Sequence, residues 1–282
     1  MTIDTRAISP IYERVSLNID KANLDISVLH TLSITNSNNR TKSNPPILFL
    51  HGFGSTKEDY ADALLDPRLH SHPILAYDAP GCGISTCSDL TRISIPFLVR
   101  CAQAILAHYS VDSFHVVGHS MGGLTALLLA HAEGDRVLSF VDIEGNLSPE
   151  DCFLSRQILA HPSSCPQDFM TSFTERARLD PQRSSALYAA NVASKVRAEA
   201  VRGIFESMVY LSDNEDLMGM FTALRGQKMF MYGEENRGLS YLGSLAKVGV
   251  SVVEIARSGH WPMYSNPVAM WDSIAGFLEG AD

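Results

Sequence analysis

The sequence predicts an α/β fold in which a mostly parallel central sheet carries helices on both faces and an inserted helical cap. Short, continuous apolar runs recur along the chain, and such runs are typical of strands that are covered on both faces. Helical patterns separate most of these runs, and strand and helix in alternation indicate a parallel sheet. The interval 147–225 breaks this alternation, because it contains no convincing buried strand.

The elements are expected in the following order. Two half-buried strands, in which apolar and polar residues alternate, come first at Tyr12–Ile19 and Leu24–Ile34. The composition of 35–46 predicts a loop. Buried strands are then expected at Ile47–Leu50, Ile74–Tyr77, Phe114–Val117, Val137–Ile143, Met229–Tyr232 and Val250–Ile255. The clearest helices are expected at Ile95–Tyr109, Met121–Ala132 and Val268–Leu278.

The length of 282 residues suits one large domain with an insertion. We interpret 147–225 as a helical cap, or lid, inserted between two strands of a core domain that comprises 1–146 and 226–282. This interval is helix-like and is interrupted by Pro149, Pro162, Pro166 and Pro181. The sequence does not indicate an oligomeric state.

Composition and charge exclude several classes of function. A net charge of −9 argues against non-specific binding to nucleic acid, which usually needs a basic face. The first twenty residues lack the pattern of a signal peptide, and no apolar stretch approaches the roughly 18–20 residues of a membrane span. Five scattered cysteines without a CxxC pair fit a reducing compartment, so we expect a cytoplasmic protein without a zinc site.

One short motif predicts a nucleophile. The residues from Phe114 to Gly123 read as a strand, a sharp turn and the start of a helix, and the turn contains G-x-S-x-G around Ser120. A serine on such a turn projects its hydroxyl above the sheet, and the helix N-terminus behind it suits a developing negative charge. The alternative is a glycine-rich turn with a merely structural serine.

Further segments resemble the α/β-hydrolase superfamily over nearly the whole chain. The sequence His51-Gly52-Phe53-Gly54 follows the strand at 47–50, as the HG-x loop does in that family. The segment 78–85, DAPGCGIS, resembles the family's D-x-P-G-x-G-x-S turn, and the segment 258–262, SGHWP, follows the last strand, where the family carries its histidine. The resemblance therefore implies an α/β-hydrolase fold.

The resemblance also implies roles for particular residues. Ser120 would attack a carbonyl carbon, and His260 would accept its proton and later deliver it to the leaving group. The backbone N–H groups of Phe53 and Met121 would form the oxyanion hole. His51 and His119 are expected to hydrogen-bond to loops instead of taking part in catalysis.

The carboxylate of this arrangement is harder to assign. Most relatives carry the acid in the turn after the strand at 229–232, and this sequence has Asn236 at that position. Asparagine can hold a histidine tautomer, but it cannot stabilise an imidazolium by charge. Glu235 and Glu234 are close by, although either would need a shifted turn.

The second place for the acid is the end of the preceding strand, where some members of the superfamily carry a glutamate. Glu144 ends this strand and precedes a glycine, at the edge of the sheet where sites form in open α/β folds. We predict Glu144 as the acid, with Glu235 and Glu234 as alternatives. The side chain of Asp142 is expected on the same face of the strand as that of Glu144, but Asp142 lies deeper in the strand, where a charge would need its own partners.

The cap is rich in aromatic and methionine side chains that suit an apolar pocket above the serine. The candidates for binding substrate are Phe153, Phe173, Met208 and Phe221 of the cap, and Trp261. The alternative is that these residues only attach the cap to the sheet.

We predict a serine hydrolase that cleaves an ester, lactone or related acyl bond of a small, largely apolar molecule, without a metal or organic cofactor. C–C bond hydrolysis, acyl transfer or lyase chemistry on the same residues stay open as alternatives. So does a ligand receptor on a hydrolase scaffold, since one fold supports many functions.

Overall fold

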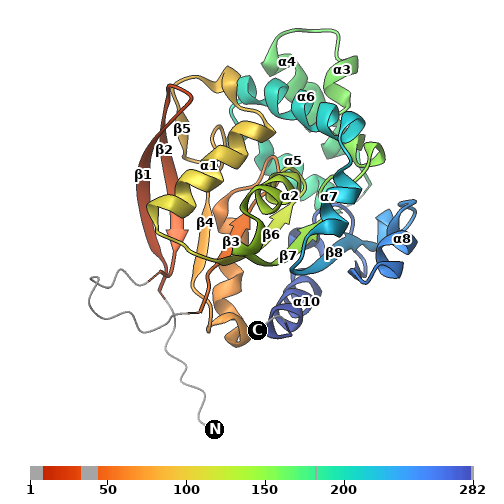
Figure 1. Cartoon of the computed structure of the whole chain (residues 1–282). Helices are drawn as coiled ribbons and strands as arrows, with labels where there is room; N and C mark the ends of the chain where they lie inside the picture. The colour runs from red at the N-terminus through yellow and green to blue at the C-terminus, as the bar shows by residue number, and fades with distance from the viewer. Residues whose placement is uncertain (1–8, 33–43, 182, 281–282) are drawn as a thin grey trace.

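The computed structural model describes residues 9–32, 44–181 and 183–280. Its centre is one sheet of nine strands, which Figure 1 shows running through the middle of the molecule. The strands are β1 (Ile11–Ile19), β2 (Ala22–His30), β3 (Ile47–Leu50), β4 (Ile74–Tyr77), β5 (Thr86–Cys87), β6 (Phe114–His119), β7 (Val137–Ile143), β8 (Gln227–Gly233) and β9 (Ser251–Ile255).

The spatial order of the strands is β1-β2-β4-β3-β6-β7-β8-β9, and β5 pairs with β2. The pairs from β4 through β3, β6, β7 and β8 to β9 are all parallel, whereas β1, β2 and β5 pair in antiparallel fashion. The carboxyl ends of β6, β7, β8 and β9 therefore meet at one edge of the sheet. This is the edge where ligand sites form in open α/β sheets.

Helices cover both faces of the sheet. The longer helices are α1 (Ile95–His108), α2 (Met121–Glu133), α4 (Pro166–Leu179), α5 (Arg183–Lys195), α6 (Ala198–Asn214) and α10 (Pro267–Glu279). The shorter ones are α3 (Gln157–Ala160), α7 (Leu217–Ala223), α8 (Leu242–Lys247) and α9 (Pro262–Ser265). None of the helices in the described ranges is both long and apolar enough to cross a bilayer.

Alternate residues of the buried strands face two separate apolar cores. Leu48 of β3 belongs to the core that also contains Phe97 of α1 and Leu124 of α2. Phe49, the next residue, faces the second core, where it packs against Trp271 of α10 with ring centroids 5.9 Å apart. A strand of four apolar residues satisfies this arrangement because both of its faces are covered.

The predicted strands and helices are present, and their ends differ by a few residues. The strands β3, β4 and β7 have the predicted bounds, and β6 continues two residues further than predicted, to His119. The second strand ends at His30, and its predicted end at Ile34 lies outside the described residues, as does most of the loop predicted at 35–46. Strand β5 and the 3₁₀ helix η1 (Lys57–Leu65) were not predicted, because two residues and an irregular helix leave no periodic pattern.

Between β7 and β8 the described chain forms helices and connecting turns. It begins with the 3₁₀ helix η5 (Pro149–Phe153) and continues through α3 to α7. Pro149 and Pro166 each occupy the first turn of a helix, where a missing N–H group costs nothing. Figure 1 shows α3, α4 and α6 together at the top of the molecule.

Candidate active site

Ser120 lies at the turn between β6 and α2. Its backbone has φ 51° and ψ −116°, a conformation that non-glycine residues rarely adopt and that recurs at functional sites. The turn is tight enough that a Cβ atom on Gly122 would lie 2.1 Å from the carbonyl oxygen of Leu50. Glycine at that position therefore lets α2 begin directly above the neighbouring strand, with Ser120 at the edge of the sheet.

The other two predicted residues of the site follow neighbouring strands. Glu144 comes directly after β7 and, like Ser120, has a positive φ, of 49°. His260 lies in the loop between β9 and α9. Because β6, β7, β8 and β9 are parallel neighbours, the loops after them converge, although His260 lies more than 100 positions from both Ser120 and Glu144 in the sequence.

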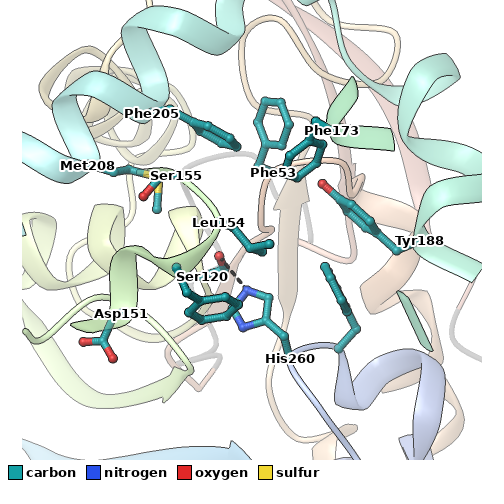
Figure 2. A pocket seen from close by; sticks show the side chains of 12 residues that line it. Phe53, Ser120, Asp151, Leu154, Ser155, Phe173, Tyr188, Phe205, Met208 and His260 are labelled. Carbon is teal, nitrogen blue, oxygen red and sulfur yellow. Dashed lines mark hydrogen bonds between the residues drawn. The ribbon is translucent and has the colours of Figure 1, made fainter. Parts of the chain in front are cut away.

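The structure brings Ser120, His260 and Glu144 into one hydrogen-bonded chain. The distance from Ser120 Oγ to His260 Nε2 is 3.0 Å, and the distance from His260 Nδ1 to Glu144 Oε2 is 2.7 Å. Figure 2 shows the first of these contacts at the floor of a pocket. The tautomer with its proton on Nδ1 satisfies both bonds: it donates to the carboxylate and leaves Nε2 free to accept from the serine hydroxyl.

The carboxylate of Glu144 has three hydrogen-bond donors. Besides His260, the backbone N–H of Gly233 donates to Oε1 at 2.6 Å, and the amide Nδ2 of Asn236 donates to Oε2 at 2.7 Å. Burial alone would raise the pKa of Glu144, but the hydrogen bond and charge of His260, together with the other two donors, outweigh burial and lower it. Glu144 is therefore a carboxylate at neutral pH.

Apart from His260, Asn236 is the donor to Glu144 that a substitution can remove without changing the backbone. We expect Asn236→Ala to raise the pKa of Glu144, because the lost bond stabilises only the charged form. The acid limb of the pH profile of kcat/KM should therefore move to higher pH, and kcat/KM at neutral pH should fall about three- to tenfold. The measurement is the pH profile of both proteins, with Glu235→Gln as the control in the same turn. An unchanged acid limb in Asn236→Ala would contradict this role.

The alternative acids lie elsewhere. Glu235 is exposed, and Glu234 accepts the backbone N–H of Arg257 at 2.7 Å and pairs with Arg237. Asp142 is buried inside the sheet, where it accepts the N–H of Gly145 and burial raises its pKa well above the usual range. The described contacts place none of these three carboxylates against His260.

The two histidines that were expected to be structural do hydrogen-bond to loops. His51 Nδ1 contacts the carbonyl oxygen of Gly52 at 2.8 Å, and its Nε2 accepts the N–H of Ala79. His119 Nε2 contacts the backbone oxygen of His260 at 2.8 Å, and burial lowers the pKa of His119 to about 3. Both rings are neutral and hold the loops that surround the site.

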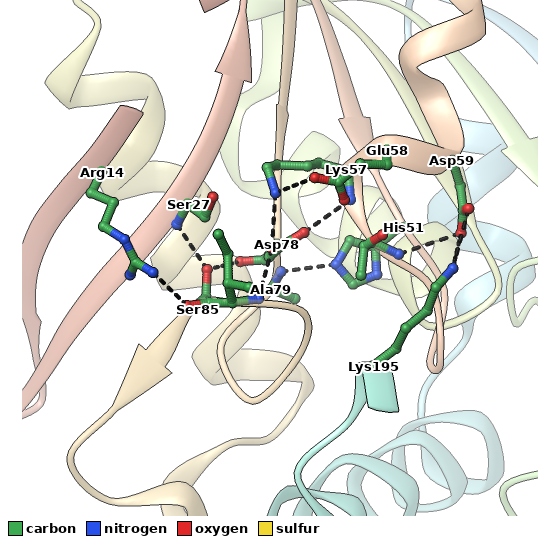
Figure 3. A network of polar contacts seen from close by, with 12 residues as sticks. Arg14, Ser27, His51, Lys57, Glu58, Asp59, Asp78, Ala79, Ser85 and Lys195 are labelled. Carbon is green, nitrogen blue, oxygen red and sulfur yellow. Dashed lines mark hydrogen bonds and ion pairs between the residues drawn. The ribbon is translucent and has the colours of Figure 1, made fainter. Parts of the chain in front are cut away.

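A polar network lies next to the segment that contains Phe53, and Figure 3 shows its members Lys57, Asp59 and Asp78. Asp78 accepts the backbone N–H and the Nζ of Lys57, at 3.0 and 3.1 Å, and both side chains are at most 2% exposed. Lys195 at the end of α5 lies 3.3 Å from Asp59 of η1, which also accepts the hydroxyl of Tyr264. This network links the segment between β7 and β8 to the rest of the molecule beside the site.

A pocket opens above Ser120, and its empty space, open solvent at the mouth included, is about 360 Å³. Its wall is mostly aromatic: Phe53 lies 4.5 Å from Phe205 and 6.1 Å from Phe173 between ring centroids. Trp261 stacks on Tyr188. The lining residues are Phe53, Ser120, Asp151, Phe153, Leu154, Ser155, Phe173, Tyr188, Phe205, Met208, His260 and Trp261.

Four of the five candidate binding residues line this pocket. They are Phe153, Phe173, Met208 and Trp261. The structure places Phe221 outside it, because the ring of Phe221 is fully buried against Phe140 in the core. Sequence analysis missed Tyr188, Ser155, Asp151, Leu154 and Phe205, since nothing in a helical pattern reveals which side of a cap helix faces the serine.

Asp151 does not bring a free charge to the pocket. Its Oδ2 accepts the N–H groups of Leu147 and Ser148, both at 2.8 Å, and its Oδ1 accepts the hydroxyl of Tyr241 at 2.8 Å. Burial raises the pKa of Asp151 to about 6, although these hydrogen bonds lower it in part. Its carboxylate thus anchors the start of the segment that follows β7.

Comparison with known proteins gives a family and several distant relatives. A model of the Alpha/beta hydrolase family matches residues 47–272. A 2-succinyl-6-hydroxy-2,4-cyclohexadiene-1-carboxylate synthase of Salmonella paratyphi C is 25% identical over 246 residues, which cover 83% of this chain and 94% of the synthase. A sn-1-specific diacylglycerol lipase of Xenopus laevis is 24% identical over 84% of this chain and 80% of the lipase.

Other likenesses are shorter or purely structural. An acetyltransferase component of an acetoin cleaving system from Cupriavidus necator is 34% identical over 33% of this chain, and the match spans only 24% of that protein. A carboxylesterase structure from Nitrososphaera gargenis has a TM-score of 0.73 at 13% identity and covers 95% of this chain and 98% of its own. An N-acyl homoserine lactonase structure has a TM-score of 0.68 at 16% identity, and the match covers 96% of this chain and 98% of the lactonase. The structural likenesses show a shared fold, and the family match over most of the chain shows that this protein belongs to the Alpha/beta hydrolase family.

Proposed function

We propose that this protein is a serine hydrolase that cleaves an ester, lactone or related acyl bond of a small, uncharged and largely apolar substrate. The observation that carries the proposal is the chain of Ser120, His260 and Glu144, with contacts of 3.0 and 2.7 Å, at the floor of an apolar pocket. A nucleophile, a base and a group that orients the base are the parts of a serine acyl-transfer site.

In the proposed first half-reaction, Ser120 Oγ attacks the scissile carbonyl carbon while His260 Nε2 accepts its proton. The carbonyl oxygen becomes an oxyanion, which we assign to the backbone N–H groups of Phe53 and Met121. Met121 is the first residue of α2, so its N–H group has no acceptor within the helix. The carbonyl re-forms, the bond to the leaving oxygen breaks, and His260 returns the proton to the leaving alcohol.

In the second half-reaction, water attacks the acyl-enzyme and His260 accepts a proton from it. Collapse of the second oxyanion releases the acid, and the proton returns to Ser120. Glu144 stays charged throughout and stabilises the imidazolium, because its lowered pKa keeps it ionised at neutral pH. We propose that 147–225 acts as a cap, since this interval supplies Phe173, Tyr188 and further walls of the pocket.

The lining of the pocket supports an uncharged substrate. No lysine or arginine is present among the described lining residues, and the carboxylate of Asp151 is already bound by three donors. A carboxylate on the substrate would therefore be buried without a partner, at a cost of several kcal/mol. The synthase relative is named for a carboxylate compound, and this lining does not favour such a compound as substrate here.

A panel of p-nitrophenyl esters tests the substrate class. We expect the highest kcat/KM with neutral acyl chains of short to medium length, because the aromatic side chains around Ser120 leave little enclosed space. Esters whose acyl chain ends in a carboxylate should react at least about 100-fold more slowly than neutral esters of equal length. A preference for the charged acyl groups would contradict the proposed substrate class.

A further inference from the structure

Two buried hydroxyl groups line the pocket and have no role in the proposed chemistry. Ser155 is 2% exposed, and its Oγ has no hydrogen-bond partner among the described residues. Tyr188 is also 2% exposed, and its hydroxyl makes no hydrogen bond within the described part of the chain. Buried hydroxyls are nearly always hydrogen-bonded, so a pair without partners in one pocket points to a partner that arrives with the ligand.

Tyr188 is held rigidly by its neighbours. Its ring stacks on Trp261 with centroids 4.5 Å apart and packs edge-on against Phe173. Gly54, at φ 79°, makes room for the hydroxyl, because a Cβ atom there would lie 2.6 Å from the phenol oxygen. Figure 2 shows the hydroxyl directed toward Phe53 and Phe173, away from His260. The hydroxyl is thus fixed in the part of the pocket remote from the imidazole.

Ser155 lies across the pocket from Tyr188, next to Met208 of α6 (Figure 2). It belongs to the turn between η5 and α3, and its backbone oxygen accepts the N–H of Ile158. The side-chain hydroxyl of Ser155 takes no part in this backbone hydrogen bond. Between the two hydroxyls the wall is apolar, formed by Phe53, Phe205 and Leu154 among others.

We propose that the acyl part of the substrate carries a neutral hydrogen-bonding group, such as a ketone, hydroxyl or amide carbonyl, in addition to the scissile carbonyl, and that the hydroxyls of Tyr188 and Ser155 are two separate partners for such a group, one on each side of the pocket (Figure 2). The inference rests on the proposed function, because it concerns the same pocket. A neutral group is favoured over an anion because the described lining residues include no cation. Sites with buried polar groups reject analogues that leave those groups unpaired, so this pair would set specificity.

The test compares p-nitrophenyl hexanoate with its 3-oxo, 4-oxo and 5-oxo analogues, which place one carbonyl at successive positions of the same chain. For each protein we would measure kcat/KM of every oxo ester relative to hexanoate. Dividing the ratio of a variant by that of the wild type cancels the intrinsic reactivity of each ester. The proteins are the wild type, Tyr188→Phe, Ser155→Ala and the control Tyr210→Phe, in which the exposed Tyr210 of α6 loses the same hydroxyl.

We expect Tyr188→Phe or Ser155→Ala to lower the ratio for at least one oxo ester about tenfold, and Tyr210→Phe to keep the wild-type ratios. Wild-type ratios in both pocket variants would overturn the inference. An equal loss of kcat/KM for all four esters would also overturn it, because the hydroxyl would then act on the reacting carbonyl. In either case hydrolysis that depends on Ser120 would leave the proposed function standing. If the wild type hydrolysed none of the esters, both proposals would fail together.

Discussion

Replacing Glu144 by glutamine is expected to lower kcat about 10³- to 10⁴-fold while the fold survives. The carboxylate accepts from Gly233, Asn236 and His260, and a glutamine amide offers a single oxygen to these three donors. If the amide nitrogen faces His260, it donates to Nδ1 and moves the ring proton to Nε2, so that the base can no longer accept from Ser120. Steady-state kinetics on the best ester of the panel measures the effect.

The matched controls for this substitution are Glu235→Gln and Glu234→Gln. Each removes the same charge from the turn after β8, and Glu235 is exposed while Glu234 is bound to Arg257 and Arg237. Both variants should retain most of the activity. A large loss in Glu235→Gln, together with a mild one in Glu144→Gln, would show that the acid had been assigned to the wrong strand end.

Replacing Ser120 by alanine should have the largest effect of all, a loss of about 10⁴- to 10⁶-fold in kcat. The variant loses the only atom that the proposal allows to form the acyl-enzyme, and His260 and the oxyanion donors remain. Labelling by a fluorophosphonate probe should disappear as well, because the probe reacts with an activated serine. Alanine accommodates the backbone at φ 51° no worse than serine does, so the fold should be preserved.

Ser273→Ala is the control for the labelling experiment. Ser273 lies on α10, which packs on the face of the sheet opposite α2. Its hydroxyl donates a hydrogen bond to the carbonyl oxygen of Ala269. It should label like the wild type. Persistent labelling of Ser120→Ala, or wild-type protein that takes no label at neutral pH, would favour a ligand receptor on this fold instead of a hydrolase.

Much of the fold follows from local patterns. The apolar runs at β3, β4 and β7 predict their strands to the residue, because strands covered on both faces consist largely of apolar residues. The turn at Ser120 is equally local, since its glycines and the following helix are adjacent in sequence. Strand β5 and helix η1 have no periodic pattern of apolar residues in the sequence. Tertiary contacts, such as the pairing of β5 with β2, stabilise them instead.

The pocket shows the limit of this reasoning. The sequence indicates that the cap is rich in aromatic residues, but a helix turns each of them toward the sheet, the pocket or solvent. Phe173 and Phe221 are equivalent candidates by composition, yet the first lines the pocket and the second packs on Phe140. Ser155 could not be singled out, because the feature that marks it is a missing hydrogen-bond partner, and Tyr188 is marked only by its place in the pocket wall.

The sequence by itself determined the family, the turn that presents Ser120 and the loop that carries His260, because each depends on residues that are neighbours along the chain. The tertiary structure alone decided which side chains meet. Parallel pairing of β7, β8 and β9 brings the ends of three distant strands together, so Glu144 reaches His260 and Glu235 is left exposed. The same pairing makes Asn236, at the position where the family resemblance led us to expect the acid, a hydrogen-bond donor to Glu144 of the neighbouring strand.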